Sequence, residues 1–147
     1  MSSELLYSEI FEKFETLETR AERIEYLKKV VNRPFIEFLT GVFNPNVQFD
    51  VEIPDYRPSF DPPGLSMTYL DSEMQRIYRF VVGHPRRAEN LSDKKKSELL
   101  LVVLESLHKD EAQLLVQLLT KKVKVKGLTA KLVHEAFPEI YIGDLED

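Results

Sequence analysis

The sequence predicts an all-α domain of about seven helices, interrupted by one long proline-rich segment. Apolar residues recur at three- and four-residue spacing over most of the chain, which is the helical period. Helix-breaking residues instead gather between residues 44 and 66. At 147 residues, the chain is expected to form a single helical domain over residues 1–142, followed by an acidic, frayed tail at 143–147.

Three helices are expected before the proline-rich segment. An amphipathic pattern covers residues 3–16. A Thr-x-x-Glu capping box at Thr19 opens a second helix that reaches about Val31. Pro34 suits the first turn of a third helix, at about 34–43. The apolar residues of these helices are spaced to pack together.

The segment at about 44–66 is expected to be an extended strap. A loop of this length is uncommon in a compact domain and is often functional. We expect it to pack on the body of the domain, because it holds six apolar side chains, namely Val47, Phe49, Val51, Ile53, Tyr56 and Phe60. Its acidic residues Asp50, Glu52 and Asp55 could bind a cation, but no glycine-turned loop stands behind them, so we expect no metal site.

Two helices are expected directly after the strap. The fourth helix spans about 66–82 and ends at Gly83 and Pro85. Ser92 can cap a fifth helix at about 93–107. Its LLLVVL segment is apolar nearly all round, so this helix is expected to be the central helix of the core.

The sixth and seventh helices end the domain. Asp110 can cap the sixth helix, at about 111–120. Thr129 can cap the seventh, which covers 129–137. Between them lies a basic turn with lysines at four of six positions, followed by Gly127. A lysine cluster that leads into a helix N-terminus is typical of an anion-binding site.

Composition and motifs exclude several classes of protein. The chain has no cysteine, which excludes disulfides and thiol nucleophiles and suits a reducing cytoplasm. The longest apolar run, Leu99–Leu104, is too short for a membrane span. Phosphate-loop, nucleophile-elbow and zinc-protease motifs are absent, and the three histidines are isolated in sequence. We therefore expect no enzyme, no cofactor, no membrane partner and no small-molecule substrate.

The net charge of −5 conceals two basic segments. Residues 74–97 hold seven basic residues against two acids, and residues 121–134 hold five lysines and no acid. These segments could form two separate solvated faces, or they could meet in space as one basic surface. The sequence leaves both arrangements open.

The segment LLTKKVKVKGLTAKLVHEAFP resembles the N-terminal DNA-binding domain of ATP-dependent DNA ligases. In that domain a basic turn leads into a short helix of the form [ST]-x-x-x-[LV]-x-x-x-[FW]-P, which matches Thr129, Val133, Phe137 and Pro138. The segment FLTGVFNPNVQFDVEIP is similar to a ligase segment in which a helix runs into an Asn/Asp-Pro turn. The -KGxTxKLVxEAFP ending is also similar to small stand-alone proteins of tailed bacteriophages, especially T4-like phages and cyanophages.

The resemblance implies a binding role only, since the Lys-x-Asp-Gly motif of ligase chemistry is absent. It nominates residues that would grip duplex phosphates, namely Lys122, Lys124, Lys126, Gly127, Thr129 and Lys131. Charge alone adds Arg86, Arg87, Lys94 and Lys95. The expected function is a non-catalytic, sequence-independent nucleic-acid-binding module of bacteriophage DNA metabolism, acting on the DNA phosphate backbone in the cytoplasm of the infected host.

An acidic phage adaptor or inhibitor, which binds a host or phage protein, is the alternative. It is favoured by the seven glutamates of residues 1–27, by the apolar strap and by the acidic tail. An acidic surface can occupy the nucleic-acid-binding face of another protein through electrostatic complementarity.

Overall fold

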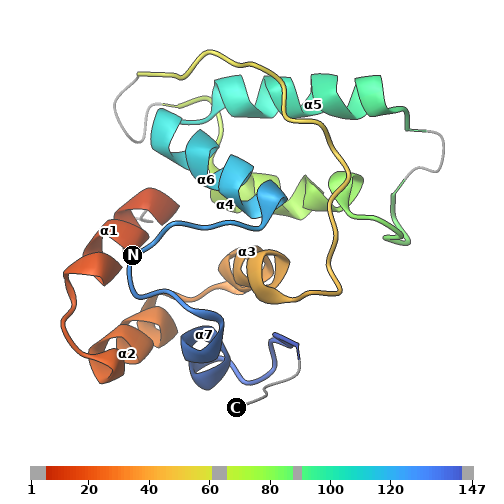
Figure 1. The fold of residues 1–147 in the computed structure, drawn as a ribbon. Helices are drawn as coiled ribbons and strands as arrows, with labels where there is room; N and C mark the ends of the chain where they lie inside the picture. The colour runs from red at the N-terminus through yellow and green to blue at the C-terminus, as the bar shows by residue number, and fades with distance from the viewer. Residues whose placement is uncertain (1–5, 61–65, 88–90, 144–147) are drawn as a thin grey trace.

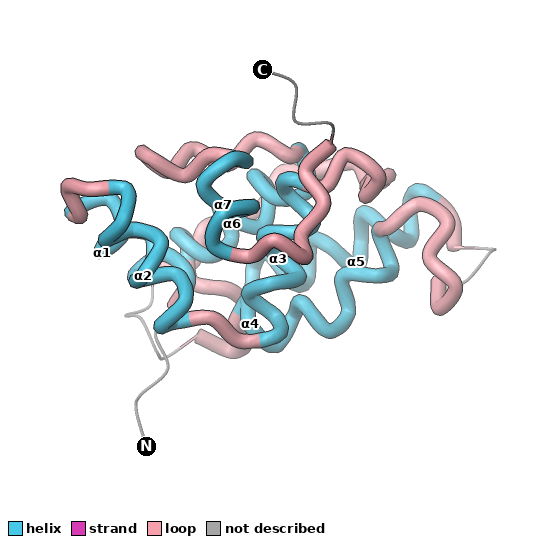
Figure 2. Tube along the Cα trace, turned by 90° about the horizontal axis from the view of Figure 1, so that it is seen from below, coloured by secondary structure: helices cyan, strands magenta, loops and turns pink. Residues whose placement is uncertain are grey.

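A computed structural model describes residues 6–60, 66–87 and 91–143 (Figure 1). It confirms the all-α domain, with seven α-helices and one 3-10 helix in the described part of the chain. Seen from below, the described residues form helices and loops, without a strand (Figure 2). The acidic tail from residue 144 onward lies outside the described residues.

The first three helices form where the sequence predicts them. They are α1 (Tyr7–Thr16), α2 (Arg20–Val30) and α3 (Arg33–Phe43). Leu6 is the extended N-cap of α1, and residues 3–5 of the expected helix lie outside the described residues. The capping box of α2 is present, since the side chain of Thr19 accepts a hydrogen bond from the amide of Glu22 at 3.1 Å.

The fourth helix is the main error of the sequence prediction. Residues 66–82 do not form one α-helix, because a four-residue helix α4 (Leu70–Glu73) runs into the 3-10 helix η1 (Met74–Phe80). The apolar residues of η1 that face the core recur every third position, at Met74, Ile77 and Phe80. That spacing fits the three residues per turn of a 3-10 helix, in which side chains three apart lie above one another.

The remaining helices are α5 (Asp93–Ser106), α6 (Lys109–Thr120) and α7 (Ala130–Ala136). The expectation that α5 is the central helix is wrong, because the side chain of Val102 is 65% exposed. The central helix is α6, which packs against α1, α3, α4 and α5. The sequence was misleading because the strap covers another side of α5 and accounts for its additional apolar residues.

The N-cap of α6 also differs from the prediction. His108 is the capping residue, and its Nδ1 accepts a hydrogen bond from the amide of Asp110 at 3.2 Å. Asp110 therefore lies within the first turn of α6, where its negative charge still favours the helix dipole.

The described part of the strap, residues 44–60, lies along α5 and contains no helix (Figure 1). Its apolar residues alternate with exposed polar ones, so that Phe49, Val51 and Ile53 pack against the core. At one end it pairs with the exit of η1, where Val82 donates its amide to the carbonyl of Gln48 at 2.8 Å. Further along, the hydroxyl of Ser97 on α5 donates to the carbonyl of Glu52.

Two charged side chains, buried Glu111 and half-buried Lys121, form hydrogen bonds at the ends of helices that are distant in sequence. The carboxylate of Glu111 on α6 accepts hydrogen bonds from the amides of Tyr7 and Ser8, at 3.0 and 2.7 Å. Burial raises the pKa of Glu111, although these bonds oppose the shift. The two bonds satisfy first-turn amides of α1 that have no partner within that helix.

Lys121 performs the matching task at the end of α3. Its backbone is left-handed, with φ 59°, and ends α6. Its Nζ donates to the carbonyls of Gly41, Asn44 and Val47, at 2.6, 2.8 and 2.8 Å. Burial lowers the pKa of this amine. Lys121, which the sequence groups with the basic turn, is therefore a structural residue.

We predict that Lys121→Met lowers the free energy of unfolding by about 2 kcal/mol, because three carbonyls lose a charged donor. Lys122→Met is the matched control, since Lys122 is exposed and a surface substitution changes stability by about 0.5 kcal/mol or less. Urea denaturation of both variants measures the difference. Equal stabilities of the two variants would show that the contacts of Lys121 contribute nothing.

Candidate nucleic-acid interface

Three of the nominated lysines lie on one side of an extended segment between α6 and α7. Lys122, Lys124 and Lys126 are exposed, whereas Val123 and Val125 are half-buried against the core. This alternation is the two-residue period of extended backbone. We call these three residues the lysine strip.

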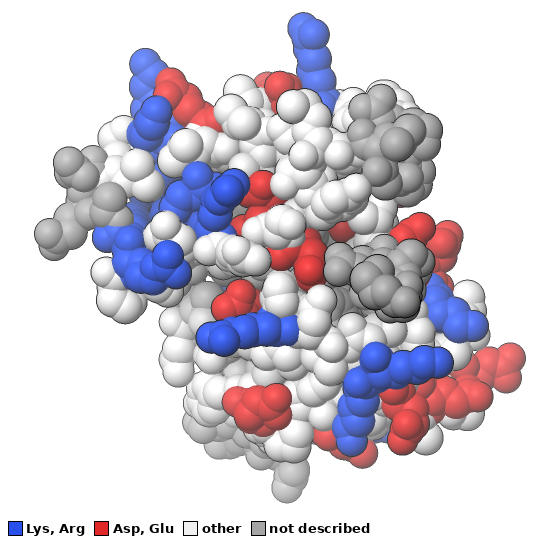
Figure 3. Space-filling view, turned by 180° about the vertical axis from the view of Figure 1, so that it is seen from behind, with Lys and Arg blue, Asp and Glu red and all other residues white. Residues whose placement is uncertain are grey.

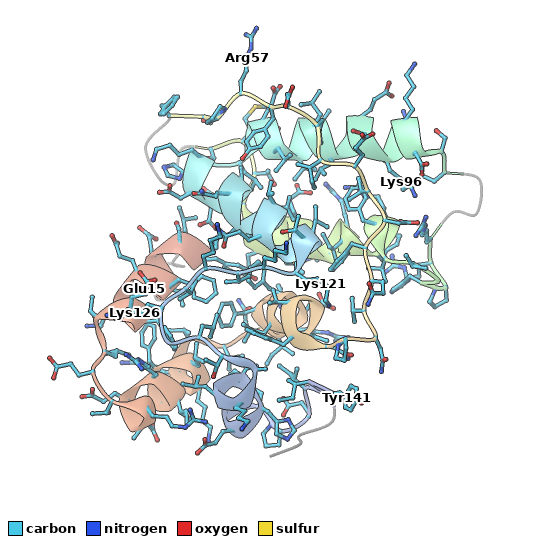
Figure 4. All side chains as sticks on the ribbon, viewed as in Figure 1. Glu15, Arg57, Lys96, Lys121, Lys126 and Tyr141 are labelled. Carbon is cyan, nitrogen blue, oxygen red and sulfur yellow. The ribbon has the colours of Figure 1, made fainter. Side chains whose placement is uncertain are left out.

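The backbone of the lysine strip is fixed by neighbouring helices. The side-chain oxygen of Gln117 on α6 accepts a hydrogen bond from the backbone amide of Lys124 at 3.2 Å. The carboxylate of Glu15 on α1 accepts a hydrogen bond from the backbone amide of Lys126 at 2.8 Å (Figure 4). Within the described residues, no acidic side chain forms an ion pair with any of the three ammonium groups.

Gly127 closes the strip for a reason of geometry. Its φ is +85°, which disfavours other residues. A Cβ at this position would lie 2.9 Å from Cζ of Arg23, whose guanidinium packs against the glycine. The glycine therefore shapes the turn, and its close neighbour is a basic side chain from α2.

Two further nominated residues follow the turn: Thr129 directly precedes α7, and Lys131 lies in its first turn. The hydroxyl of Thr129 accepts the amide of Leu132 at 3.2 Å, as expected for an N-cap. Lys131 is exposed. The same short helix carries Glu135, which pairs with Arg20 of α2 at 2.6 Å. Thr129 therefore already serves one first-turn amide of α7, and a carboxylate lies close to this end of the interface.

The second basic segment forms a separate surface around η1 and the start of α5. We use the name arginine surface for the basic residues of this segment that are exposed or half-buried and form no ion pair with the described part of the strap: Arg76, Arg79, Arg86, Lys94 and Lys95. Lysine and arginine side chains gather on this side of the molecule when it is seen from behind (Figure 3). Burial lowers the pKa of Arg79, but a guanidinium keeps its charge at neutral pH.

Arg87, in contrast, is largely turned away from solvent, although the sequence nominated it as a residue that binds phosphates. Its Nη2 lies 2.7 Å from Oδ2 of Asp50, and its Nη1 donates to the carbonyl of Val81 at 3.0 Å. The buried Lys96 approaches the same carboxylate, at 3.2 Å. Arg87 therefore joins the strap to the end of η1, a role that adjacent Arg86 does not share and that charge alone cannot reveal.

The same contacts occupy one of the three acids of the strap. Asp50 is already paired with two basic side chains, so its carboxylate is not available to a metal ion. In the ranges that the structure describes, no group of three or more acidic or histidine side chains is placed to hold a metal ion.

Asp50→Asn is predicted to reduce stability at pH 7, with an effect that disappears in acid. Burial opposes ionisation of Asp50, but bonds from Arg87 and Lys96 outweigh it and hold the pKa below the ordinary 3.8. The contribution is therefore present above pH 3.8 and is lost as the pH falls through the lower, folded-state pKa. Denaturation at several pH values measures it, with exposed Asp55→Asn as the control. A constant difference between Asp50→Asn and the unsubstituted protein down to the lowest pH would contradict the assignment.

The two basic segments do not meet. Lys96, in the first turn of α5, and Lys126, beside Glu15 of α1, lie at opposite sides of the molecule (Figure 4). Lys121 lies between them, turned toward the end of α3. The lysine strip and the arginine surface are therefore two separate basic faces rather than one continuous surface.

The interface includes residues that sequence reasoning did not nominate. Arg76 and Arg79 belong to the arginine surface. The sequence includes them among the seven basic residues of 74–97, but it did not nominate them as binding residues. Tyr78 lies half-buried beneath Arg86, with its ring centre 4.5 Å from Cζ of the guanidinium. An aromatic residue within a run of basic residues was the available signal for this arrangement.

Together, the fold and these contacts define a small all-α domain with two separate basic faces and a strap fixed by ion pairs. The chain belongs to the Family of unknown function (DUF6433), which residues 10–125 match. No curated protein and no solved structure matches it. Among the described helices, none is both long and apolar enough to cross a membrane.

Proposed function

We propose that this protein is a non-catalytic, sequence-independent nucleic-acid-binding module whose lysine strip contacts the phosphate backbone. The observation that supports this proposal most directly is the outward alignment of Lys122, Lys124 and Lys126 on a backbone that Gln117 and Glu15 already hold. Because this backbone is already ordered, binding would cost little further backbone entropy.

The charge balance of the chain sets the expected strength of this interaction. Lysines that neutralise phosphates release counterions, which makes affinity steeply dependent on salt. The net charge is −5, and the exposed acids Glu12 and Glu15 lie on the neighbouring helix α1. We therefore expect weak binding, with a dissociation constant of roughly 10⁻⁴ to 10⁻⁶ M at physiological salt, as for non-specific binding in general.

The biological setting of the proposal rests on sequence resemblance. Similarity to ligase DNA-binding domains and to tailed-phage proteins favours a role in bacteriophage DNA metabolism in the cytoplasm of the infected host. The missing Lys-x-Asp-Gly motif supports a role without nucleotidyl transfer.

Lys124→Glu combined with Lys126→Glu is expected to weaken binding to labelled duplex and single-stranded DNA. The slope of log affinity against log salt should fall by about two units, one for each lost phosphate contact. Fluorescence anisotropy at several salt concentrations measures both quantities.

The matched control is Lys28→Glu combined with Lys29→Glu, which changes the net charge equally at two exposed positions of α2. It should leave the slope nearly unchanged. Equal losses in the two double variants would mean that overall charge, rather than the strip, governs binding. Unchanged binding of the strip variant would remove the site assignment.

A protein-binding role is the second candidate, and exposed apolar side chains favour it. Phe60 is 77% exposed, Met67 88% and Val102 65%. Thr68 donates its amide to the carbonyl of Ser106 at 3.3 Å, which brings Met67 to the end of α5, one turn beyond Val102. These residues would meet a host or phage protein if the chain acts as an adaptor or inhibitor.

Met67→Lys is predicted to abolish recovery of such a partner from infected-cell lysate, because a charge at a buried contact is costly to desolvate. Tyr141→Lys is the control, since Tyr141 is also exposed but lies beside α7, away from α5 (Figure 4). A protein that is recovered with both variants does not bind at this patch. If the unsubstituted chain recovers no protein at all, the result counts against a protein-binding role.

A further inference from the structure

A cavity of about 250 Å³ lies between α3 and η1, beneath the start of the strap. Its apolar lining comes from the strap and from η1 with its C-cap residue: Val47, Phe49, Met74, Ile77 and Val81. Its polar lining includes Glu37, Thr40 and Gln75. The cavity therefore combines an apolar surface with side chains that can exchange hydrogen bonds with a planar, polar-edged ligand.

A stack of three side chains borders this cavity. The guanidinium of Arg86 lies 4.5 Å from the ring centre of Tyr78. The rings of Tyr78 and His84 are 5.5 Å apart and inclined by 37°. Arg86 is exposed, its Cζ lies over the ring of Tyr78, and it lines the cavity, so a ligand that enters the cavity can reach its guanidinium. Arginine planes and aromatic rings are the surfaces on which unpaired bases stack.

The histidine is oriented by a backbone contact. Nδ1 of His84 accepts the amide of Arg86 at 3.0 Å. A ring nitrogen that accepts a hydrogen bond carries no proton, so the neutral imidazole holds its proton on Nε2. His84 is therefore prepared to donate a hydrogen bond at the edge of the cavity.

The cavity itself is lined by one acid, Glu37, and one arginine, Arg86, and η1 adds two further basic side chains. Arg79 directly follows Tyr78 in η1, and its Nε donates a hydrogen bond to the carbonyl of Arg76 at 3.1 Å. The buried Glu73 approaches Arg76 at 3.7 Å and offsets part of this charge. An aromatic side chain of a peptide could fill the cavity but would not use the surrounding cations, so a nucleic acid fits the whole arrangement better.

We propose that this cavity and the outer face of Arg86 bind one unpaired nucleobase of a single-stranded nucleic acid, with the adjoining phosphates against Arg76 and Arg79. This inference rests on the proposed nucleic-acid-binding function. It adds a second site, far from the lysine strip, and a preference for single strands. Contact with the planar face of a base, rather than with a particular edge, keeps the interaction tolerant of sequence.

The test compares two probes of equal charge, a labelled oligothymidylate of about 12 nucleotides and an abasic deoxyribose-phosphate oligomer of the same length. The unsubstituted protein should bind the oligothymidylate roughly tenfold more tightly at one salt concentration, because each stacked base adds affinity. Arg86→Lys keeps the charge but loses the planar surface. This variant should lose the preference and retain the salt dependence.

Lys95→Met is the reciprocal control, since it removes an exposed charge of the arginine surface and leaves Tyr78, His84 and Arg86 unchanged. It should weaken binding to both probes and keep the preference for bases. Equal, salt-dependent binding of the two probes by the unsubstituted protein would overturn the base site and leave the proposed function standing. A preference that survives in Arg86→Lys would also overturn it. No binding of either probe at low salt would remove the proposed function, and the base site with it.

Discussion

The ammonium group of Lys121 holds together the part of the molecule on which both basic faces depend. Its three bonds to the carbonyls of Gly41, Asn44 and Val47 fix the end of α3 and the direction in which the strap leaves. The left-handed backbone of the same residue ends α6 and starts the lysine strip. A cation is well placed there, since the C-terminal end of a helix carries partial negative charge. The strap in turn lines the cavity beside Arg86.

The two basic faces offer different chemistry to a nucleic acid. The lysine strip presents compact ammonium groups, which suit phosphates from any direction. The arginine surface presents planar guanidinium groups, one of them already stacked on Tyr78. Because the faces lie at opposite sides of the molecule, the proposed function implies that a short strand would engage only one of them, whereas a long or flexible strand would reach both. The proposal therefore requires local basic faces and not a basic protein as a whole.

Features set by local sequence were predictable, and features set by distant partners were not. Thr19, Ser92 and Thr129 cap the expected helices, because a capping side chain bonds an amide only three residues away. Lys121 and Lys122 are adjacent and chemically identical, yet only Lys121 meets the end of α3. Arg86 and Arg87 differ in the same way, through the distant Asp50. The apolar LLLVVL run wrongly predicted α5 as the central helix. A count of apolar residues cannot show whether other helices or the strap pack against them.

The carboxylate of Glu111 gives the N-terminal end of α1 an unusual dependence on the rest of the chain. The first amides of a helix have no partner within it and ordinarily exchange their hydrogens with solvent freely. The amide of Tyr7 is instead bonded to a residue 104 positions away. Its hydrogen can exchange only when the bond to the Glu111 carboxylate on α6 opens. The outermost turn of the first helix, where fraying is normally greatest, would thus be protected by a contact with the central helix of the domain.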